Sequence, residues 1–481
     1  MNINDINENW DFIIGLEIHV QLECNSKIFS NCEYEYDNAP NSQTCPTSLG
    51  LPGALPSVNQ TAIESAILFG QAVNGNVSES FTFARKHYFY PDLPKGYQIS
   101  QFDQPIISGG SIPIWWNDKE YRINLTRAHL EEDAGKSSHN NLSNTSNLDY
   151  NRSGAALIEI VTEPVLVHPE QAKIFMQRVK QIVNYIDISS AEMEKGKLRC
   201  DANISLSKKG SGNFGVKTEI KNINSFKNVQ KAIESEIRRQ NKILNNGDKI
   251  QQATLTWNND KNTAEIMRVK ENADDYRYFP DPDLPPVNLN KSFINNIKLS
   301  MPVLPFEYEK KWMKKYDLSL NECSILSSSK EIAEYFENVV NFKVSPKKVS
   351  SWVSTELFRL FNESNSDFNS KKVIAKDLKG IIELIEQNKI TKNSGKNILR
   401  ELFETGKRLK DVLKRGNFDS SDINIKNIID NVLSIYQNEV LRYKNGEEKL
   451  IGFFMGQINR ETKGKVNHEL IISELKKKLQ N

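Results

Sequence analysis

Three segments in the first half of the chain alternate apolar and polar residues with a period of two, at residues 14–22, 198–206 and 216–222. Because successive side chains of a β-strand point to opposite faces, each segment is expected to form a strand with one apolar and one polar face. The polar faces carry Glu17 and His19, then Arg199, Asp201 and Asn203, then Lys217, Glu219 and Lys221. These types bind ligands and make hydrogen bonds, so we interpret them as one concave functional surface. An ordinary solvated strand face is the alternative.

The period of the apolar residues changes near residue 290, which indicates a domain boundary. The run 278–286 contains four prolines, which interrupt both helices and central strands. Beyond it the apolar residues recur with the helical period of 3.6, as in residues 378–385. We therefore expect an α+β chain in three parts. They are a mixed domain over residues 1–290, a helical domain over 291–405 and a helical tail over 406–481.

The charge is distributed unevenly along the chain. The formal net charge is +2, yet residues 371–481 contain 23 Lys and Arg against 15 Asp and Glu. Clustered basic residues neutralise phosphates, so this asymmetry favours a nucleic-acid contact at the C-terminal end. A Lys-rich helical surface without a partner explains it equally well.

The cysteines and the apolar runs predict a cytoplasmic protein. Five scattered cysteines do not suit a disulfide framework, so reduced thiols are expected. The first residues are acidic and Asn-rich, and no run of 18 apolar residues occurs. We expect neither an export signal nor a membrane span.

Residues 210–215 match the glycine pattern G-x-G-x-x-G, but their context argues against a nucleotide-binding loop. Such a loop needs a helix directly after it, whereas residues 216–222 continue with strand alternation. A P-loop needs Gly before Lys, and Val216 precedes Lys217. We predict a hairpin turn here, so any nucleotide site must be of another kind.

The acidic run at residues 129–133 suggests a metal site when it is combined with the polar strand faces. The run contains Glu131, Glu132 and Asp133, and neighbouring candidate strands carry Glu17 with His19 and Asp201. Mg²⁺ prefers carboxylate and phosphate oxygens, so this set suits Mg²⁺ bridging the phosphates of ATP. Acids at this spacing are also common on solvated surfaces.

Many ordered blocks of the chain resemble the B subunits of the tRNA-dependent amidotransferases, the GatB/GatE family. The resemblance is collinear from about residue 12 to the C-terminus. The blocks are GLEIHVQL at 15–22, YFYPDLPKGYQISQ at 88–101, LEEDAGK at 130–136, LIEIV at 157–161, LRCDAN at 198–203, EIKN at 219–222, NSF at 224–226, DDYRYFP at 274–280, FETG at 403–406 and GFFMGQ at 452–457.

The resemblance implies a cradle domain built on an antiparallel sheet, a helical domain and a tail similar to the YqeY family. It implies that ATP activates the side-chain carboxylate of mischarged Glu-tRNA(Gln), Asp-tRNA(Asn) or both, and that ammonia then converts it to the amide. It also implies a heterotrimer with an amidase-fold GatA-type glutaminase and a small GatC-type subunit. Neither DNA nor a membrane is an expected partner.

The resemblance also implies individual site residues. The Mg²⁺/ATP site maps onto Glu17, His19, Glu131, Glu132 and Asp201, on the face that the strand periodicity indicates. Lys86 lies at the ammonia entrance in this assignment. Arg199, Lys217 or Lys221 could stabilise the transferring phosphoryl oxygens, and the sequence leaves the choice among them open.

One departure from the family concerns zinc. Many relatives carry C-x-C followed by C-x-x-C, a four-thiolate zinc pattern. The corresponding positions here are Ser30, Cys32, Cys45 and Ser48. Two thiolates do not close a structural tetrahedral site, so no zinc is expected, and Cys32 and Cys45 are expected to be small buried side chains.

Two other classes of function compete with this interpretation. A non-catalytic tRNA-binding scaffold would keep the basic tail but leaves the polar Glu/His/Asp face unexplained. A glycosidase with paired carboxylates needs an open, Trp-rich sugar cleft, and the six Trp lie mostly outside the acidic blocks. The chain also lacks the Ser-Ser-Lys arrangement of an amidase, so it requires a separate glutaminase to make ammonia.

Overall fold

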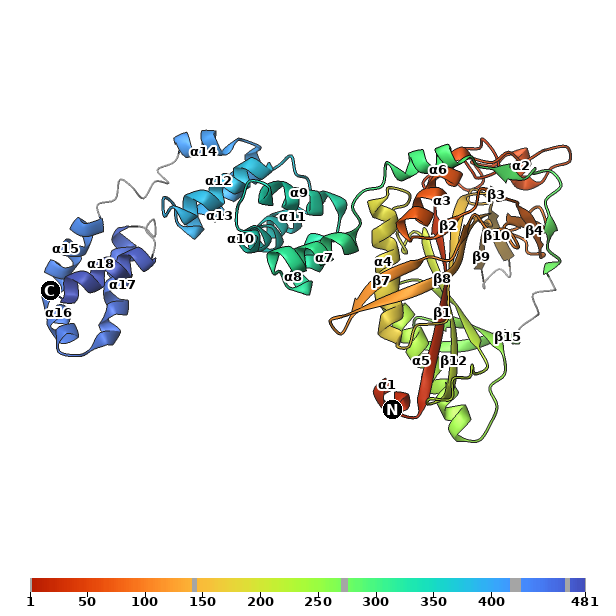
Figure 1. Cartoon of the computed structure of the whole chain (residues 1–481), viewed down its shortest axis with the longest axis horizontal. Helices are drawn as coiled ribbons and strands as arrows, with labels where there is room; N and C mark the ends of the chain where they lie inside the picture. Colours follow the sequence, from red (N-terminus) through yellow and green to blue (C-terminus); the bar gives the residue numbers. More distant parts are fainter. Residues whose placement is uncertain (1, 141–144, 270–275, 416–424, 463–467, 481) are drawn as a thin grey trace. The chain divides into compact units, whose positions relative to one another are not determined.

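The computed structural model describes residues 2–140, 145–269, 276–415, 425–462 and 468–480. The chain divides into two compact units, Met1–Phe306 and Glu307–Asn481, and each is described by itself (Figure 1). Within the described ranges, no helix is long and apolar enough to cross a membrane. The domain boundaries predicted at residues 290 and 405 stay predictions.

The first unit is organised around a ten-stranded, mostly antiparallel sheet. Its order is β15-β14-β13-β12-β1-β11-β8-β6-β2, and β7 pairs with β8. β13 and β14 are parallel, whereas β1 pairs in antiparallel fashion with both β11 and β12. The strands are β1 (Trp10–Gln21), β2 (Asn76–Val77), β6 (Ile107–Ser108), β7 (Ser111–Trp116), β8 (Lys119–Glu132), β11 (Ala156–Thr162), β12 (Leu198–Lys208), β13 (Thr218–Ile223), β14 (Ala253–Asn258) and β15 (Thr263–Val269).

Among the described residues of this unit, three smaller sheets and six helices accompany the large sheet. The small sheets pair β9 (Lys136–Asn140) with β10 (Thr145–Asp149), β5 (Tyr97–Ser100) and β16 (Phe279–Pro280) with β4 (Ala84–His87), and β3 (Ser80–Phe81) with β17 (Val287–Asn288). The helices are α1 (Ile3–Asn7), α2 (Pro46–Leu49), α3 (Gln60–Ala72), α4 (Pro169–Tyr185), α5 (Phe226–Asn245) and α6 (Lys291–Lys298).

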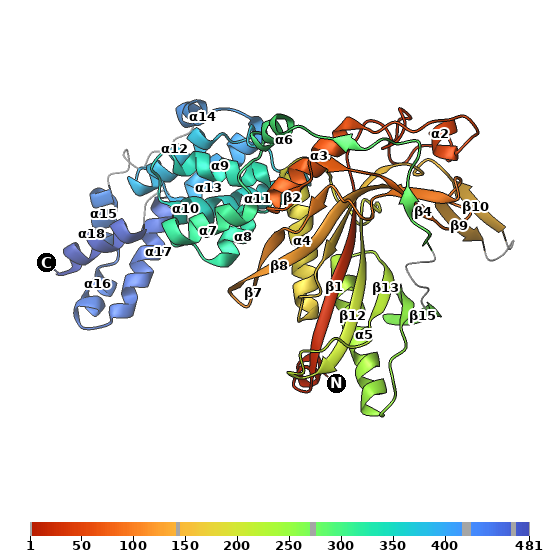
Figure 2. The same cartoon turned by 45° about the vertical axis from the view of Figure 1, so that its right-hand side comes forward.

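One side of the sheet is apolar and is buried under helices. α5 packs along β12, α4 against β7 and β1, and α3 against β8 and β11 (Figure 2). Ile18 of β1 lies between Ile160 of β11 and Cys200 of β12, and all three are at most 1% exposed. Burying each such aliphatic side chain contributes roughly 1.5–3 kcal/mol. The polar residues that alternate with this set therefore lie on the opposite side of the sheet.

The alternation predicted the strands well. The segments at 14–22 and 198–206 are confirmed as β1 and β12, although both strands are longer than predicted. The third strand begins at Thr218, so Lys217 lies just outside it. Residues 209–217 join β12 to the antiparallel β13 without a helix, which confirms the hairpin turn and excludes a nucleotide loop of the Rossmann type.

The second unit is helical, as the 3.6 period predicted. α12, α13 and α14 pack together, and Leu409 of α14 donates its backbone N–H to Asp377 of α12 at 3.3 Å. α15 to α18 form their own small core around Phe454 and Ile458. The elements are α7 (Pro305–Tyr316), α8 (Leu320–Leu326), α9 (Lys330–Val340), α10 (Pro346–Ser351), η2 (Trp352–Leu357), α11 (Phe358–Glu363), α12 (Ala375–Glu386), α13 (Lys392–Thr405), α14 (Leu409–Arg415), α15 (Ile425–Ile435), α16 (Gln437–Lys444), η3 (Glu448–Leu450), α17 (Ile451–Glu461) and α18 (His468–Gln480).

Candidate active site

The strand register places titratable residues in adjacent rows across the polar side of the sheet. In one row, His129 of β8 lies opposite Glu159 of β11, which lies opposite His19 of β1. In the next row, Glu17 of β1 lies opposite Asp201 of β12. Directly opposed side chains of antiparallel strands start about 5 Å apart, so the register brings these groups into contact.

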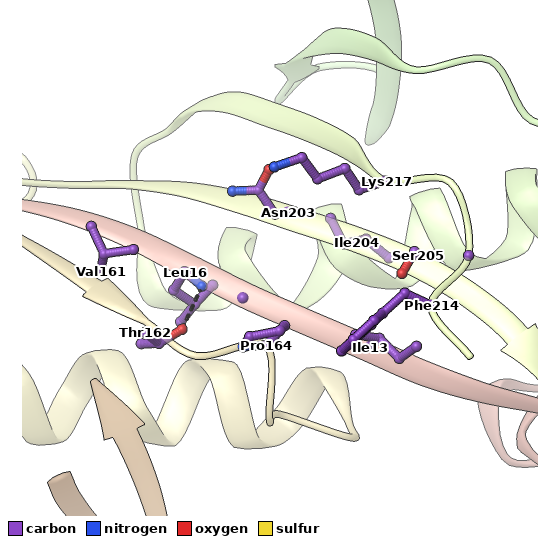
Figure 3. A pocket seen from close by; sticks show the side chains of 12 residues that line it. Ile13, Leu16, Val161, Thr162, Pro164, Asn203, Ile204, Ser205, Phe214 and Lys217 are labelled. Carbon is purple, nitrogen blue, oxygen red and sulfur yellow. Dashed lines mark hydrogen bonds between the residues drawn. The ribbon is translucent and has the colours of Figure 1, made fainter. Parts of the chain in front are cut away.

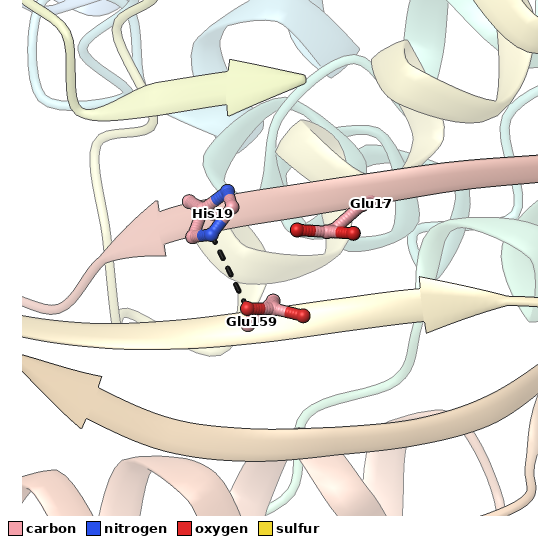
Figure 4. Close-up of side chains that lie close together, drawn as sticks. All are labelled: Glu17, His19 and Glu159. Atoms are coloured by element: carbon pink, nitrogen blue, oxygen red, sulfur yellow. Dashed lines mark ion pairs between the residues drawn. The ribbon is translucent and has the colours of Figure 1, made fainter. Parts of the chain in front are cut away.

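Four of these side chains and Glu131 form a compact acid cluster, defined here as Glu17, His19, His129, Glu131 and Glu159. His19 Nε2 lies 3.3 Å from a carboxylate oxygen of Glu131 and 3.3 Å from one of Glu159. The ligand atoms of Glu17, His19 and Glu159 all lie within 4.8 Å of one another (Figure 4). Those of His129, Glu131 and Glu159 do so as well. The two groups share Glu159.

The members of the acid cluster determine one another's charge. Burial favours a neutral imidazole, but hydrogen bonds to Glu131 and Glu159 outweigh it and raise the pKa of His19 well above its usual value. Burial also favours a neutral carboxyl, yet His129 and the hydrogen bond with His19 lower the pKa of Glu159 to about 2. Burial, with the charge of Glu159, raises the pKa of Glu17. Glu17 is therefore more readily protonated than Glu159.

The structure brings Glu17, His19 and Glu131 together, places Glu132 on the other side of β8, and leaves Asp201 opposite Glu17 but outside the two ligand groups. Glu132 follows Glu131 on β8, so its side chain points to the other side of the strand. There Glu132 Oε1 accepts hydrogen bonds from Lys95 Nζ at 2.5 Å and from the backbone N–H of Ile99 at 2.8 Å. Asp201 Oδ2 accepts a hydrogen bond from Lys221 Nζ at 2.5 Å. Neither acid belongs to the two ligand groups found among the described residues.

Lys86 of β4 is electrostatically coupled to the acid cluster. Its Nζ atom lies 5.0 Å from the centroid of the Tyr276 ring. Burial alone would lower the pKa of Lys86, but Tyr278 and then the carboxylates of the acid cluster raise it above its usual value. Lys86 is therefore a fixed positive charge at neutral pH and does not serve as a base.

The three predicted phosphoryl-binding cations lie in different environments. Arg199 Nη2 donates to Asp133 Oδ2 at 2.8 Å. Lys221 is paired with Asp201 and lies 3.3 Å from Glu219. Lys217 is exposed at the end of the connection between β12 and β13. Lys217 is the most accessible of the three to an incoming anion.

A cavity of about 330 Å³ opens on the polar side of the sheet, beside β1 on the N-terminal side of Glu17. Apolar side chains such as Phe214 line most of it, while Asn203 and Lys217 supply polar groups (Figure 3). Gly15, two residues before Glu17 on β1, also lines the cavity. An apolar cavity with few polar groups is typical of a small-ligand site.

Two members of the acid cluster, His129 and Glu159, are missing from the set predicted from sequence. Both had a signal in the sequence. His129 stands two residues before Glu131, which puts both on one face of a strand, and Glu159 is a single charge within the apolar run 156–161. Their nearness to His19 depends on the order β1-β11-β8, which links segments far apart in the chain.

The class of protein follows from comparison with known families. Residues 12–295 match the family described as the GatB/GatE catalytic domain, and residues 334–479 match the GatB_Yqey family, described as the GatB domain. The first match contains the whole polar face with the acid cluster. The antiparallel sheet and its acid cluster thus belong to a catalytic domain of the GatB/GatE class.

Curated relatives give the more particular assignment. The chain is 44% identical over 464 residues to the B subunit of the aspartyl/glutamyl-tRNA(Asn/Gln) amidotransferase of Thermodesulfovibrio yellowstonii, covering 96% of this chain and 98% of that protein. The corresponding B subunit of Persephonella marina is 43% identical over 95% of this chain and 97% of its own length. That of Carboxydothermus hydrogenoformans is 42% identical, over 98% and 99%. The chain belongs to the family of B subunits of aspartyl/glutamyl-tRNA(Asn/Gln) amidotransferases.

Proposed function

We propose that this chain activates the side-chain carboxylate of mischarged Glu-tRNA(Gln), Asp-tRNA(Asn) or both with ATP and completes its conversion to the amide with ammonia. The observation that carries the proposal is the acid cluster, in which two imidazoles and three carboxylates from three adjacent strands meet on one face of the sheet. The names of the curated relatives support the same substrates.

The reaction needs activation because a carboxylate repels nucleophiles and oxide is a poor leaving group. A carboxylate oxygen of the substrate attacks the γ-phosphorus of ATP, and the bond from that phosphorus to the β-phosphate oxygen breaks. This step gives an acyl phosphate and ADP. Ammonia then attacks the acyl carbon, phosphate leaves with the electrons of the C–O bond, and loss of a proton gives the amide. Catalysis of the first step rests on positioning and charge stabilisation.

The acid cluster fits a divalent cation. Its donor set is dominated by carboxylate oxygens, which Mg²⁺ prefers. Two of the carboxylates, those of Glu131 and Glu159, already converge on a positive charge, the protonated imidazole of His19. Glu17, His19 and Glu159 are the side chains proposed to hold the ion, with Glu131 beside them. His19 would bind it as the neutral imidazole, so binding would displace the proton that Glu131 and Glu159 hold there. When bound, Mg²⁺ neutralises phosphate charge and orients the γ-phosphoryl group.

The surrounding residues have supporting roles in this proposal. Lys86 keeps a positive charge beside the cluster, where it stabilises phosphoryl or acyl-phosphate oxygens near the proposed ammonia entrance. Lys217 and the cavity that it lines accommodate the nucleotide. Arg199 is paired with Asp133, and Lys221 is paired with Asp201. Glu132 links β8 to β5 by accepting the backbone N–H of Ile99. These groups are therefore proposed to position the site.

The proposed assembly contains further subunits. The relatives are named as one subunit of an amidotransferase, which implies a complex, and we infer a GatA-type glutaminase as the ammonia source, with a small GatC-type subunit. A mischarged tRNA is the substrate, and no DNA or membrane is involved. The five cysteines are free, in keeping with the cytoplasmic location that we infer.

Phosphate release by the complex tests the proposal. The partner glutaminase is blocked, ammonium chloride is supplied, and ATP-dependent phosphate release is measured with mischarged tRNA. Correctly amidated tRNA serves as the control, because it has no free side-chain carboxylate. Release that requires the mischarged tRNA is expected. If phosphate release is the same with both tRNAs, the chain does not activate the carboxylate and the scaffold alternative gains support.

The residues at the family's zinc positions lie together in the structure. Cys45 Sγ is 3.4 Å from Ser30 Oγ and 3.3 Å from Ser48 Oγ, and Cys32 donates its backbone N–H to Ser30 Oγ. Cys32 and Cys45 are only half-buried, rather than fully buried as expected. Hydroxyls are poor zinc ligands, so the absence of zinc from the purified protein stays our prediction.

Cys45 is predicted to be the most reactive cysteine at neutral pH. Burial would raise its pKa, but hydrogen bonds from Ser30 and Ser48 lower it to about 7, whereas burial raises that of Cys24 to about 11. The thiolate is the nucleophile, so alkylation of Cys45 should rise with pH and reach half its maximal rate near pH 7. Peptide mass spectrometry after pulsed iodoacetamide measures both sites. Equal rates at Cys24 and Cys45 at pH 7 would contradict the prediction.

The C-terminal helices are proposed to bind the body of the tRNA through their basic faces. Because α14 packs on α12 and α13, a truncation after Arg415 keeps that helical packing intact while removing α15 to α18. The truncated chain should bind tRNA less tightly and with a shallower salt dependence, since each lost phosphate contact removes about one counterion-release term. Binding isotherms across a salt series measure this. Unchanged affinity and slope would show that these helices are structural only.

A further inference from the structure

Five aromatic side chains form a continuous aromatic row beside Lys86, defined here as Phe102, Tyr278, Tyr276, Tyr88 and Tyr90. The rings of Phe102 and Tyr278 are stacked, with centroids 4.2 Å apart and planes inclined by 7°. The following neighbours in the row are 6.1, 6.3 and 6.0 Å apart. The aromatic row thus combines rings from residues 88–102 with rings from residues 276–278, which are far apart in sequence.

The aromatic row is accessible at its ends, and its middle lies beside Lys86 and is connected to β8 through Gln98. Phe102 is 40% exposed and Tyr90 is 55% exposed, which is high for rings of this size. Lys86 Nζ lies over Tyr276, the central ring, and the same lysine is coupled to the acid cluster. Tyr88 donates a hydrogen bond to Gln98, whose amide donates to the backbone oxygen of Glu132 on β8.

We propose that the aromatic row binds the unpaired 3′-terminal nucleotides of the mischarged tRNA by stacking. The inference rests on the proposed function, because the aminoacyl group is esterified to the terminal ribose. Its carboxylate reaches the acid cluster only if the last nucleotides lie close to it. Exposed aromatic faces bind unpaired bases with little sequence preference, and the charge of Lys86 complements the phosphates.

The test replaces the rings at the two ends of the row in the complete complex, as the double variant Phe102→Leu/Tyr90→Leu. Leucine keeps apolar bulk but removes the aromatic face. The control is Phe89→Leu, because Phe89 is 84% exposed and adjacent in sequence, yet makes no ring contact with the row among the described residues. Kd is measured for uncharged tRNA and for the same tRNA without its unpaired 3′-terminal nucleotides.

The double variant is expected to bind intact tRNA about tenfold more weakly and the trimmed tRNA as tightly as the wild type. Phe89→Leu should bind both tRNAs as the wild type does. An equal loss for both tRNAs would show that the rings support the fold, and no loss for either would show that the row is not the contact. Either result overturns the inference.

Phosphate release at saturating mischarged tRNA separates this inference from the proposed function. If the double variant reaches the wild-type rate there but shows no selective loss of affinity, carboxylate activation stands and only the aromatic contact is wrong. If the wild-type complex itself does not release phosphate with mischarged tRNA, the proposed function fails, and the binding comparison still reports on the aromatic row.

Discussion

Glu159→Gln is expected to lower the rate of carboxylate activation by at least about 100-fold. Glu159 belongs to both candidate ligand groups, so the substitution removes one carboxylate from each of them. It also removes one of the two carboxylates that hold the proton on His19. The amide has nearly the same shape as the carboxylate, so the sheet should remain folded. ATP-dependent phosphate release with mischarged tRNA and ammonium measures the effect.

Glu265→Gln is the matched control for this substitution. Glu265 lies on β15, at the edge of the same sheet, and its exposed carboxylate pairs with Lys261. The control should keep the wild-type rate, and both variants should leave glutamine hydrolysis by the partner unchanged. A Glu159→Gln complex that retains most of its phosphate release would place the chemistry outside the acid cluster.

Glu131→Gln and Glu132→Gln distinguish a cluster residue from a supporting one. Glu131 contacts His19, whereas Glu132 is tied to Lys95 and Ile99 on the other side of β8. The Glu131 variant is therefore expected to lose more activity than the Glu132 variant. The reverse order would restore Glu132 as the direct ligand that the sequence resemblance implies.

Arg239→Ala is expected to destabilise the first unit by roughly 3 kcal/mol. Glu236 of α5 is fully buried, and Arg239 donates to it through Nε and Nη2, both at 2.7 Å. Thr218 of β13 and Gln240 complete the network with hydrogen bonds to the same carboxylate. Loss of the guanidinium leaves a buried carboxylate without its counter-charge beside two strands of the sheet. Urea unfolding, followed by hydrogen exchange of α5 amides, measures the change.

Two variants show whether the loss arises from the buried charge. Arg238→Ala removes the neighbouring, largely exposed partner of Glu234, and should cost less than about 1 kcal/mol. The double substitution Glu236→Met/Arg239→Met removes both charges and should recover part of the stability that Arg239→Ala loses. If the double variant is less stable than Arg239→Ala alone, the ion pair itself supplies the stability.

The sequence predicts the local strand structure around the site but not all of the residues that form the acid cluster. Alternation predicted β1 and β12, because both strands have one side against the helices and the other carrying polar groups. It placed Glu17 and His19 correctly on one face. It did not reveal that β11 and β8 follow β1 in the sheet, so Glu159 and His129 were missed. The pairing of β1 with β11 joins segments more than 100 residues apart, which local periodicity does not encode.

The other two predicted ligands, Glu132 and Asp201, fall outside the two ligand groups for different reasons. Glu131 and Glu132 are neighbours in sequence and look equivalent as ligands, yet the strand period sends them to opposite sides. Asp201 shares the face of Glu17, but Lys221 of the next strand neutralises it. The presence of that lysine beside Asp201 follows from the pairing of β12 with β13, including its irregular register.

The position of β1 within the sheet affects how the site meets its substrate. β1 is hydrogen-bonded to β12 over most of its length and to β11 along Glu17–Gln21, so Glu17 and His19 stand on a backbone that is fixed on both edges. The charges of the cluster are consequently aligned before any ligand arrives, and little reorganisation energy is spent on them during phosphoryl transfer. Turnover should then be limited by delivery of the aminoacyl end and should slow with solvent viscosity.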